Sequence, residues 1–128
     1  MPIQLRINIF DPERKVYTYD VVDETGQVVG LAQLRTQASK SWEMPDGFES
    51  HIYYEIKPDH RGRGYGTQTL TELIKAAGQQ GINPLIATVN ASNTASISVI
   101  EKNQGKLLQQ GQTANGKAVF KYLIDTSH

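Results

Sequence analysis

The six residues Arg61-Gly62-Arg63-Gly64-Tyr65-Gly66 combine three glycines with two arginines, and this is the strongest chemical pattern in the chain. The segment follows a run typical of a β-strand and precedes a run typical of a helix. The first turn of a helix has amide N–H groups without backbone partners, beside the positive end of the helix dipole, so phosphate oxygens bind well there. The glycines remove Cβ atoms that would hold a phosphate away and permit positive φ angles, and the arginines add charge and hydrogen-bond donors. The pattern therefore predicts a phosphate-binding loop.

Other phosphate-binding motifs fit this segment less well. A P-loop ends in Gly-Lys-Ser/Thr, whereas Gly66-Thr67 has no lysine. A dinucleotide-binding fold needs Gly-x-Gly-x-x-Gly, whereas the last position counted from Gly62 is Thr67. Two further interpretations stay open: a strand–helix connector without a ligand, and an Arg-Gly segment that binds nucleic acid. Segments of the second kind are usually long and disordered, whereas predicted elements bracket this one.

The elements that position the loop follow from the spacing of apolar residues. Alternation of apolar and polar residues, as in residues 3–9, indicates a strand. Leu70, Leu73, Ile74 and Ala77 recur at the spacing of one helix face. The predicted elements are strands at residues 3–9, 16–22, 28–35 and 50–57, a helix from residue 67, a strand at 85–89, a helix at about 94–103, and strands at 106–110 and 118–124.

This order, β-β-β-β-α-β-α-β-β, predicts an α/β (α+β) fold with a mixed, mostly antiparallel sheet. The strands at 50–57 and 85–89 are joined through a helix as a βαβ unit, so a parallel pair is expected at the centre of the sheet. The polar stretch 36–49 is expected to be a long loop or a loose hairpin end.

Three large apolar side chains, Trp42, Met44 and Phe48, lie in that predicted loop. Such residues either fold back on the core, which is the preferred interpretation, or line a ligand site.

The bulk composition narrows the function classes. The length of 128 residues fits one domain that covers residues 1–128. Cysteine is absent and His51, His60 and His128 have no metal-ligand spacing, so disulfides, thiolate chemistry and a metal are not expected. With 13 basic and 13 acidic residues, the chain lacks the basic excess of nucleic-acid-binding proteins. No run approaches the roughly 20 apolar residues of a membrane helix, and no signal pattern begins the chain, so the expected location is the cytoplasm.

The loop and its surroundings resemble the GNAT N-acetyltransferase superfamily. The acetyl-CoA loop of that family reads Arg/Gln-x-x-Gly-x-Gly/Ala after the fourth strand, and Arg61, Gly64 and Gly66 match it. The segment Asn93-x-x-Ser96-x-x-Val99-Ile100-Glu101-Lys102 looks like the helix that lies beside the coenzyme in that family. The stretch Tyr54-Glu55-Ile56-Lys57-Pro58 before the loop is similar to the branch that includes ribosomal-protein N-terminal acetyltransferases.

The resemblance implies an acetyl-CoA site built mainly from backbone groups. The amides of residues 62–67 would hold the pyrophosphate, and the backbone of Tyr54 and Ile56 would pair with the pantetheine arm like an added strand. The Tyr54 N–H would stabilise the oxyanion of a tetrahedral intermediate, and Asn93 would contact the pantetheine or act as a plain helix N-cap. The implied coenzyme-binding set is Tyr54, Ile56, Arg61, Gly62, Arg63, Gly64, Tyr65, Gly66, Thr67, Asn93 and Ser96.

The chain departs from the family pattern in two places. Many members have two helices that wall the acceptor site, whereas the residues before the strand at 16–22 look extended. The acceptor site is then either open or completed by a second chain, as in a homodimer. Many members also use a Tyr seven residues after the Asn to protonate the departing thiolate, and that position is Ile100. Ser96 is therefore the candidate acid, with a helix serine bonded to a nearby carbonyl as the alternative.

The amine that attacks the thioester must be neutral, so the reaction favours a nearby base. Deprotonating an α-amine, with a pKa near 7.7–8.0, costs about 1 kcal/mol at pH 7, and deprotonating a lysine costs roughly 4–5 kcal/mol. The candidate bases are Glu49, His51 and Glu55. His51 has the better unshifted pKa, Glu55 is nearer the expected thioester, and a solvated strand face is the alternative for all three.

The sequence thus predicts an N-acetyltransferase that moves an acetyl group from acetyl-CoA to a primary amine of a small molecule or peptide. A non-catalytic acyl-CoA-binding module of the same fold is the alternative, supported by Ile100 and the short N-terminal part. A nucleic-acid or protein interaction domain is a third interpretation, and no membrane partner is expected.

Overall fold

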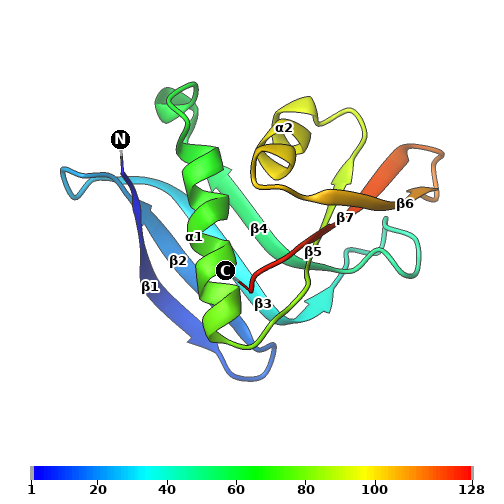
Figure 1. Ribbon diagram of the computed structural model, residues 1–128, viewed down its shortest axis with the longest axis horizontal. Coiled ribbons are helices and arrows are strands. Elements are labelled where there is room, and N and C mark those ends of the chain that lie inside the picture. The colour runs from blue at the N-terminus through cyan, green and yellow to red at the C-terminus, as the bar shows by residue number, and fades with distance from the viewer. Residues whose placement is uncertain (1, 128) are drawn as a thin grey trace.

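The computed structural model describes residues 2–127, which form seven strands, two α-helices and one short 3₁₀ helix (Figure 1). The predicted order of strands and helices is confirmed. The elements are β1 (Gln4–Asp11), β2 (Val16–Val22), β3 (Val28–Ser39), β4 (Ser50–Ile56), η1 (Pro58–His60), α1 (Tyr65–Gln79), β5 (Leu85–Asn90), α2 (Thr94–Lys102), β6 (Lys106–Gln112) and β7 (Ala118–Ile124).

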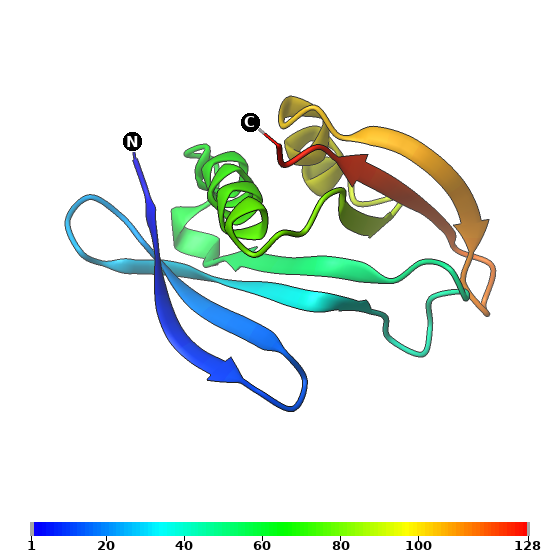
Figure 2. The same cartoon turned by 60° about the horizontal axis from the view of Figure 1, so that its bottom comes forward.

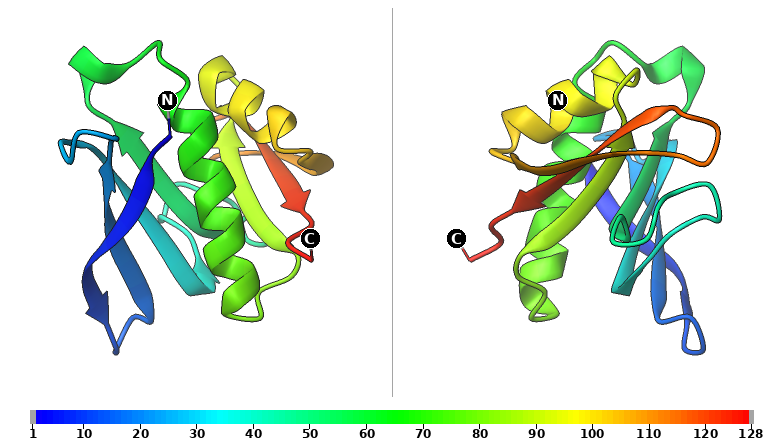
Figure 3. Two further views of the ribbon diagram at one scale, coloured as in Figure 1. Left: turned by 60° about the vertical axis from the view of Figure 1, so that its left-hand side comes forward. Right: turned by 90° about the vertical axis from the view of Figure 1, so that its right-hand side faces the viewer.

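The strands form two antiparallel sheets with the orders β1-β2-β3-β4 and β5-β7-β6. β4 and β5 begin side by side and run in the same general direction, but they diverge toward their carboxyl ends (Figures 1 and 3). At their starts, the Ile86 N–H donates to His51 Nδ1 at 2.9 Å and the Ser50 hydroxyl donates to the Ile86 carbonyl at 3.3 Å. Within residues 2–127 no ladder of backbone hydrogen bonds joins β4 to β5. The structure therefore differs from the expected parallel pair inside one sheet, because side chains alone bridge the two strands.

Helix α1 covers one face of the first sheet (Figure 2). The predicted apolar stripe from Leu70 to Ala77 is buried there, and each fully buried leucine contributes about 1.5–3 kcal/mol. The helix begins at Tyr65, two residues before its predicted start. Gly64 ends the preceding loop with a left-handed φ of 79°, and the Tyr65 ring is only 2% exposed because it packs in the core.

Strand β3 continues to Ser39, beyond its predicted end at Arg35. Ser39 pairs with Ser50 after an irregularity in the ladder between β3 and β4. The connecting loop is therefore shorter than predicted and covers residues 40–49.

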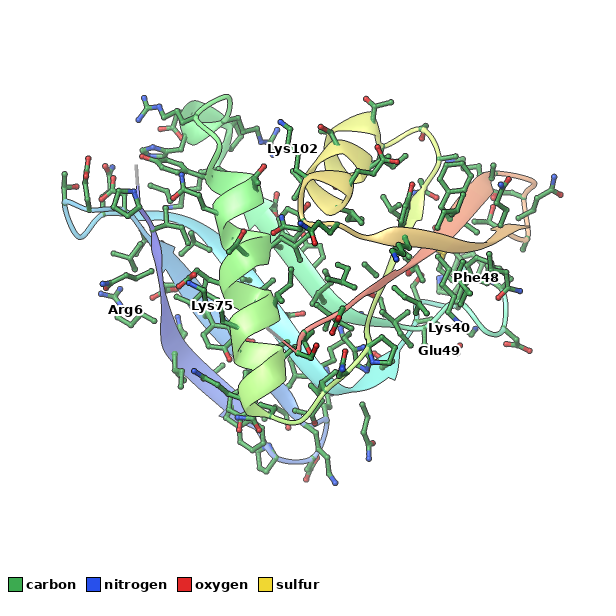
Figure 4. The ribbon with its side chains drawn as sticks, viewed as in Figure 1. Arg6, Lys40, Phe48, Glu49, Lys75 and Lys102 are labelled. Carbon is green, nitrogen blue, oxygen red and sulfur yellow. The ribbon has the colours of Figure 1, made fainter. Side chains whose placement is uncertain are left out.

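The loop at residues 40–49 folds against the second sheet (Figure 4). Phe48 is buried on Gly111, where an added Cβ would lie 2.9 Å from Phe48 Cζ. Lys121 Nζ also donates to the Gly47 carbonyl at 2.8 Å. Trp42, in contrast, is 84% exposed. The core interpretation is thus confirmed for Phe48 and wrong for Trp42.

The two helices are held together by Asn103, the residue that ends α2. Its Oδ1 accepts from the Thr71 hydroxyl at 2.7 Å, and its Nδ2 donates to the Thr67 carbonyl at 3.2 Å. These bonds fix α2 beside the first turns of α1. Across residues 2–127, the helices are too short or too polar to cross a membrane.

Candidate functional site

The loop between η1 and α1 presents a row of unpaired backbone amides. Gly62 and Gly64 both have φ angles of 79°, and nothing lies within 4 Å of the place where a Cβ would stand on either. Gly64 is the N-cap of α1, and no side chain caps the helix. Among residues 2–127, no protein group accepts a hydrogen bond from the amides of residues 62–67. The helix start is therefore open and free to bind an anion.

A cavity of about 470 Å³ lies in front of this helix start, between the end of β4 and the start of α2. Its walls come from the end of β4, the loop after η1, the first turn of α1 and the start of α2. Arg63 and His51 do not line it. The predicted site residues that it brings together are Tyr54, Glu55, Ile56, Arg61, Gly62, Gly64, Tyr65, Gly66, Thr67, Asn93 and Ser96.

The free edge of β4 forms one wall of the cavity. The Lys57 N–H donates to the Val29 carbonyl at 2.9 Å, and the register between β3 and β4 is regular from Gly30 to Leu34. Hydrogen-bonded and non-hydrogen-bonded pairs alternate in an antiparallel ladder. The backbone groups of Tyr54 and Ile56 therefore point away from β3, toward the side on which β5 diverges.

Part of the Arg61 side chain forms a hydrogen bond within the protein. Its Nε donates to the Ile56 carbonyl at 2.9 Å, so the loop is braced against the end of β4. This bond occupies one of the four backbone groups on the free edge. Sequence reasoning assigned Arg61 to a phosphate and did not anticipate this contact.

The start of α2 forms the opposite wall. Asn93 is the N-cap and its Oδ1 accepts from the Ser96 N–H at 3.2 Å, so the predicted capping role is confirmed. Ser96 is half-buried, and its hydroxyl donates to no carbonyl within residues 2–127. Ile100 is 3% exposed and does not line the cavity. It packs instead against Gly105, where an added Cβ would collide with Ile100 Cγ2.

The three candidate bases lie in different surroundings. Glu55 is exposed at the edge of the cavity and its carboxylate accepts from the Tyr53 hydroxyl at 3.0 Å, a bond that raises the pKa of Tyr53. His51 lies at the joined end of β4 and β5, where burial lowers its pKa and Nδ1 is occupied by the Ile86 N–H. Glu49 accepts from the Gly47 N–H at 3.3 Å in the loop beyond β3 (Figure 4). Only Glu55 borders the cavity.

Two polar side-chain atoms of the site were given no role from the sequence. The Tyr54 hydroxyl and His60 Nδ1 are buried without a hydrogen-bond partner among the described residues. Burial raises the pKa of Tyr54, and the nearby Ser96 side chain lowers it in part. His60 lines the cavity and is 8% exposed. Its position next to Arg61 was the only sequence signal for it.

These residues fit the acetyl-CoA that the resemblance implies. The open amides and the glycines without obstructing neighbours suit a diphosphate, and the free edge of β4 suits an extended arm with amide groups. In residues 2–127 no group of three or more His, Asp or Glu side chains is arranged to hold a metal ion.

Comparisons with known proteins agree with this fold. A profile of the acetyltransferase (GNAT) family matches residues 2–105. An L-methionine sulfoximine/L-methionine sulfone acetyltransferase of Pseudomonas aeruginosa is 30% identical over 96 residues, which are 70% of this chain and 53% of that protein. An L-amino acid N-acyltransferase of Escherichia coli is 31% identical over 83 residues, 63% of this chain and 45% of that protein. The chain thus spans about half the length of the curated relatives it matches.

Solved structures share the fold at low sequence identity. A spermidine N-acetyltransferase chimera from Vibrio cholerae and hSSAT has a TM-score of 0.73 at 12% identity, covering 99% of this chain and 97% of that one. An acetyltransferase of Salmonella typhimurium, solved with its cofactor acetyl-CoA, has a TM-score of 0.64 at 21% identity, covering 87% and 65%. The predicted α/β fold class is confirmed. The ribosomal-protein branch stays a prediction, because these relatives are described as acting on small molecules.

Proposed function

This chain belongs to the acetyltransferase (GNAT) family, and we propose that it is an N-acetyltransferase that moves an acetyl group from acetyl-CoA to a primary amine. One observation carries the proposal: the amides of residues 62–67 have no protein partner at the start of α1, and they face a cavity that the free edge of β4 also borders.

In this proposal the amides of residues 62–67 bind the pyrophosphate of the coenzyme. Arg61 contributes charge from the part of its guanidinium that does not bond Ile56. The backbone of Tyr54 and the N–H of Ile56 pair with the pantetheine arm, and Asn93, which lines the same cavity, contacts it through its side-chain amide. Charge-assisted hydrogen bonds, each worth roughly 1.5–3 kcal/mol, dominate the binding energy over the helix dipole, which contributes about 0.3–1 kcal/mol.

The acetyl group then lies near the Tyr54 N–H, which stabilises the oxyanion that forms when the amine attacks the carbonyl carbon. Glu55 is the proposed base, because it is the one candidate carboxylate at the cavity among the described residues. Ser96 is the proposed partner of the departing sulfur, since its hydroxyl is not committed to a carbonyl of the protein. His51 and the side chain of Arg63, which the sequence also suggested, are not part of this proposal because they do not line the cavity.

The proposed acceptor is an α-amine or another small amine with a similarly low pKa. Deprotonating an α-amine at pH 7 costs about 1 kcal/mol, so an exposed carboxylate such as Glu55 is a sufficient base in this proposal. Deprotonating a lysine costs roughly 4–5 kcal/mol. The amino-acid substrates in the names of the curated relatives support the same class. A peptide α-amine, as in the ribosomal-protein branch, stays within this class.

A non-catalytic acyl-CoA-binding module is the second candidate. The observation that favours it is Ile100, which is buried at the position where many family members carry the tyrosine that protonates the departing thiolate. Binding without turnover would distinguish this candidate from the enzyme.

The test has two stages. Acetyl-CoA at a hundredfold excess over its Kd should stabilise the fold by about 2.7 kcal/mol, which raises the melting temperature by several degrees. The double variant Arg61→Glu, Gly64→Glu should abolish that shift. A panel of amino acids, polyamines and short peptides is then assayed for release of free coenzyme A. No stabilisation by acetyl-CoA would overturn the proposal, and stabilisation without release for any amine would favour the non-catalytic module.

A further inference from the structure

The Tyr54 side chain carries a polar atom that the described part of the fold leaves without a hydrogen-bond partner. Its hydroxyl is buried, and among residues 2–127 it makes no hydrogen bond of ordinary geometry. Leaving a buried hydroxyl unpaired is costly, so such a group usually marks a place where a ligand or a moving partner completes the bond. A phenylalanine or leucine would fill the same space without this cost.

The surroundings of the ring show which elements enclose it. A methyl group added at Gly66 would lie 3.8 Å from Tyr54 Cε2 and 3.5 Å from Val99 Cγ2, so the ring fits between the first turn of α1 and the inner face of α2. Ser96 is one turn before Val99 on that face, and it lines the same cavity as Tyr54. The Ser96 side chain is close enough to interact with the phenol and lower its pKa in part, against the larger raising effect of burial.

We propose that, once coenzyme A is bound, the Ser96 O–H turns from the phenol to the sulfur of coenzyme A, and the Tyr54 hydroxyl then donates a hydrogen bond to Ser96 Oγ. Tyr54 is then a positioning residue that acts through Ser96, and it supplies from β4 the help that a tyrosine on α2 would give in place of Ile100. This inference rests on the proposed function and assigns the Tyr54 side chain, in addition to its backbone, to the same site.

The chemistry balances without an additional reactant. The amine nitrogen forms a bond to the thioester carbonyl carbon, its proton passes to the proposed base Glu55, and the C–S bond breaks with the electron pair on sulfur. A phenol, with a pKa near 10, is a weaker acid than a thiol, with a pKa near 8.5, so the phenol keeps its proton while it donates. The Tyr54–Ser96 pair therefore stabilises the departing thiolate as a hydrogen-bonded anion, and solvent protonates it after release.

The experiment measures the thiol pKa of bound coenzyme A and needs no acceptor amine. Coenzyme A is bound to the protein, confirmed by calorimetry, and its thiolate is followed by ultraviolet absorbance through a pH titration, with S-methyl-coenzyme A as the baseline. The variants are Tyr54→Phe and Ser96→Ala, and the matched control is Tyr17→Phe, a tyrosine of β2 that packs on Phe10 outside the cavity. The other titratable groups that line the cavity, Glu55, His60, Arg61 and Tyr65, are unchanged in all three proteins.

The expected result is a bound thiol pKa that is about one unit lower in the wild type than in Tyr54→Phe or Ser96→Ala, the size of one hydrogen bond to a charged group. Tyr17→Phe should match the wild type. Equal thiol pKa values in all four proteins, with coenzyme A bound, would overturn the Tyr54–Ser96 pair and leave the proposed function standing. If Tyr54→Phe does not fold, an unchanged thiol pKa in Ser96→Ala overturns the pair by itself. Absence of coenzyme A binding by the wild type would overturn both.

Discussion

Comparing Gly64→Ala with Gly116→Ala separates the stability cost of alanine in a left-handed conformation from the loss of a ligand site. Gly64 has φ 79° and Gly116, in the turn between β6 and β7, has φ 84°, and neither has an atom within 4 Å of an added Cβ. The left-handed conformation costs an L-residue about 1–2 kcal/mol, so Gly64→Ala and Gly116→Ala should lower the melting temperature by similar amounts of a few degrees.

The two variants should differ in coenzyme binding. An added Cβ at Gly64 would meet no protein atom, but under the proposed function it would occupy the space through which a diphosphate reaches the amides of residues 62–67. Losing one charge-assisted hydrogen bond costs about 1.5–3 kcal/mol, which corresponds to roughly a 10- to 150-fold rise in Kd. Gly116→Ala should bind acetyl-CoA like the wild type.

Isothermal titration calorimetry with acetyl-CoA measures both affinities, and denaturation curves measure both stabilities. If the two variants bind acetyl-CoA equally well at matched loss of stability, the diphosphate does not sit at the start of α1 and the reasoning is refuted.

Three further predictions concern the scaffold that positions the site. Burial lowers the His51 pKa, so the unfolded chain binds the proton more readily than the folded chain. The free energy of unfolding should therefore fall as the pH drops below about 6.5 and stay level above it. In urea titrations at several pH values, His51→Gln should lose this contribution to the pH dependence of stability. Asn103→Ala should cost about 1–3 kcal/mol in urea denaturation, since it leaves polar groups between α1 and α2 unpaired, and an unchanged midpoint would contradict the role assigned to that side chain. Phe48→Ala should cost about 3–5 kcal/mol, whereas Trp42→Ala in the same loop should stay within about 0.5 kcal/mol; similar losses would show that the loop does not pack as described.

Local sequence patterns were enough to predict much of the fold. The alternation in residues 3–9 and the stripe from Leu70 to Ala77 each specify an element through its own residues, and these predictions are confirmed. The extension of β3 to Ser39 was missed because its cause is the partner Ser50 on the next strand. The split into two sheets was missed for the same reason, since strand pairing is a tertiary property.

The site was predictable where backbone groups form it and less so where side chains do. The glycine spacing correctly indicated unpaired amides at a helix start. The bond from Arg61 to the Ile56 carbonyl and the buried hydroxyl of Tyr54 depend on how the loop and α2 pack, which periodicity does not encode. The same packing places His51 at the joined end of the strands, outside the cavity.

The most direct test follows the backbone amides by ¹⁵N-edited NMR while acetyl-CoA is added. The account predicts that the resonances of residues 62–67 show the largest shifts, and that adenosine 3′,5′-bisphosphate, which lacks the diphosphate bridge, shifts them less. Saturation with acetyl-CoA that leaves these resonances in place would contradict the account, because the free amides at the start of α1 would then have no part in binding.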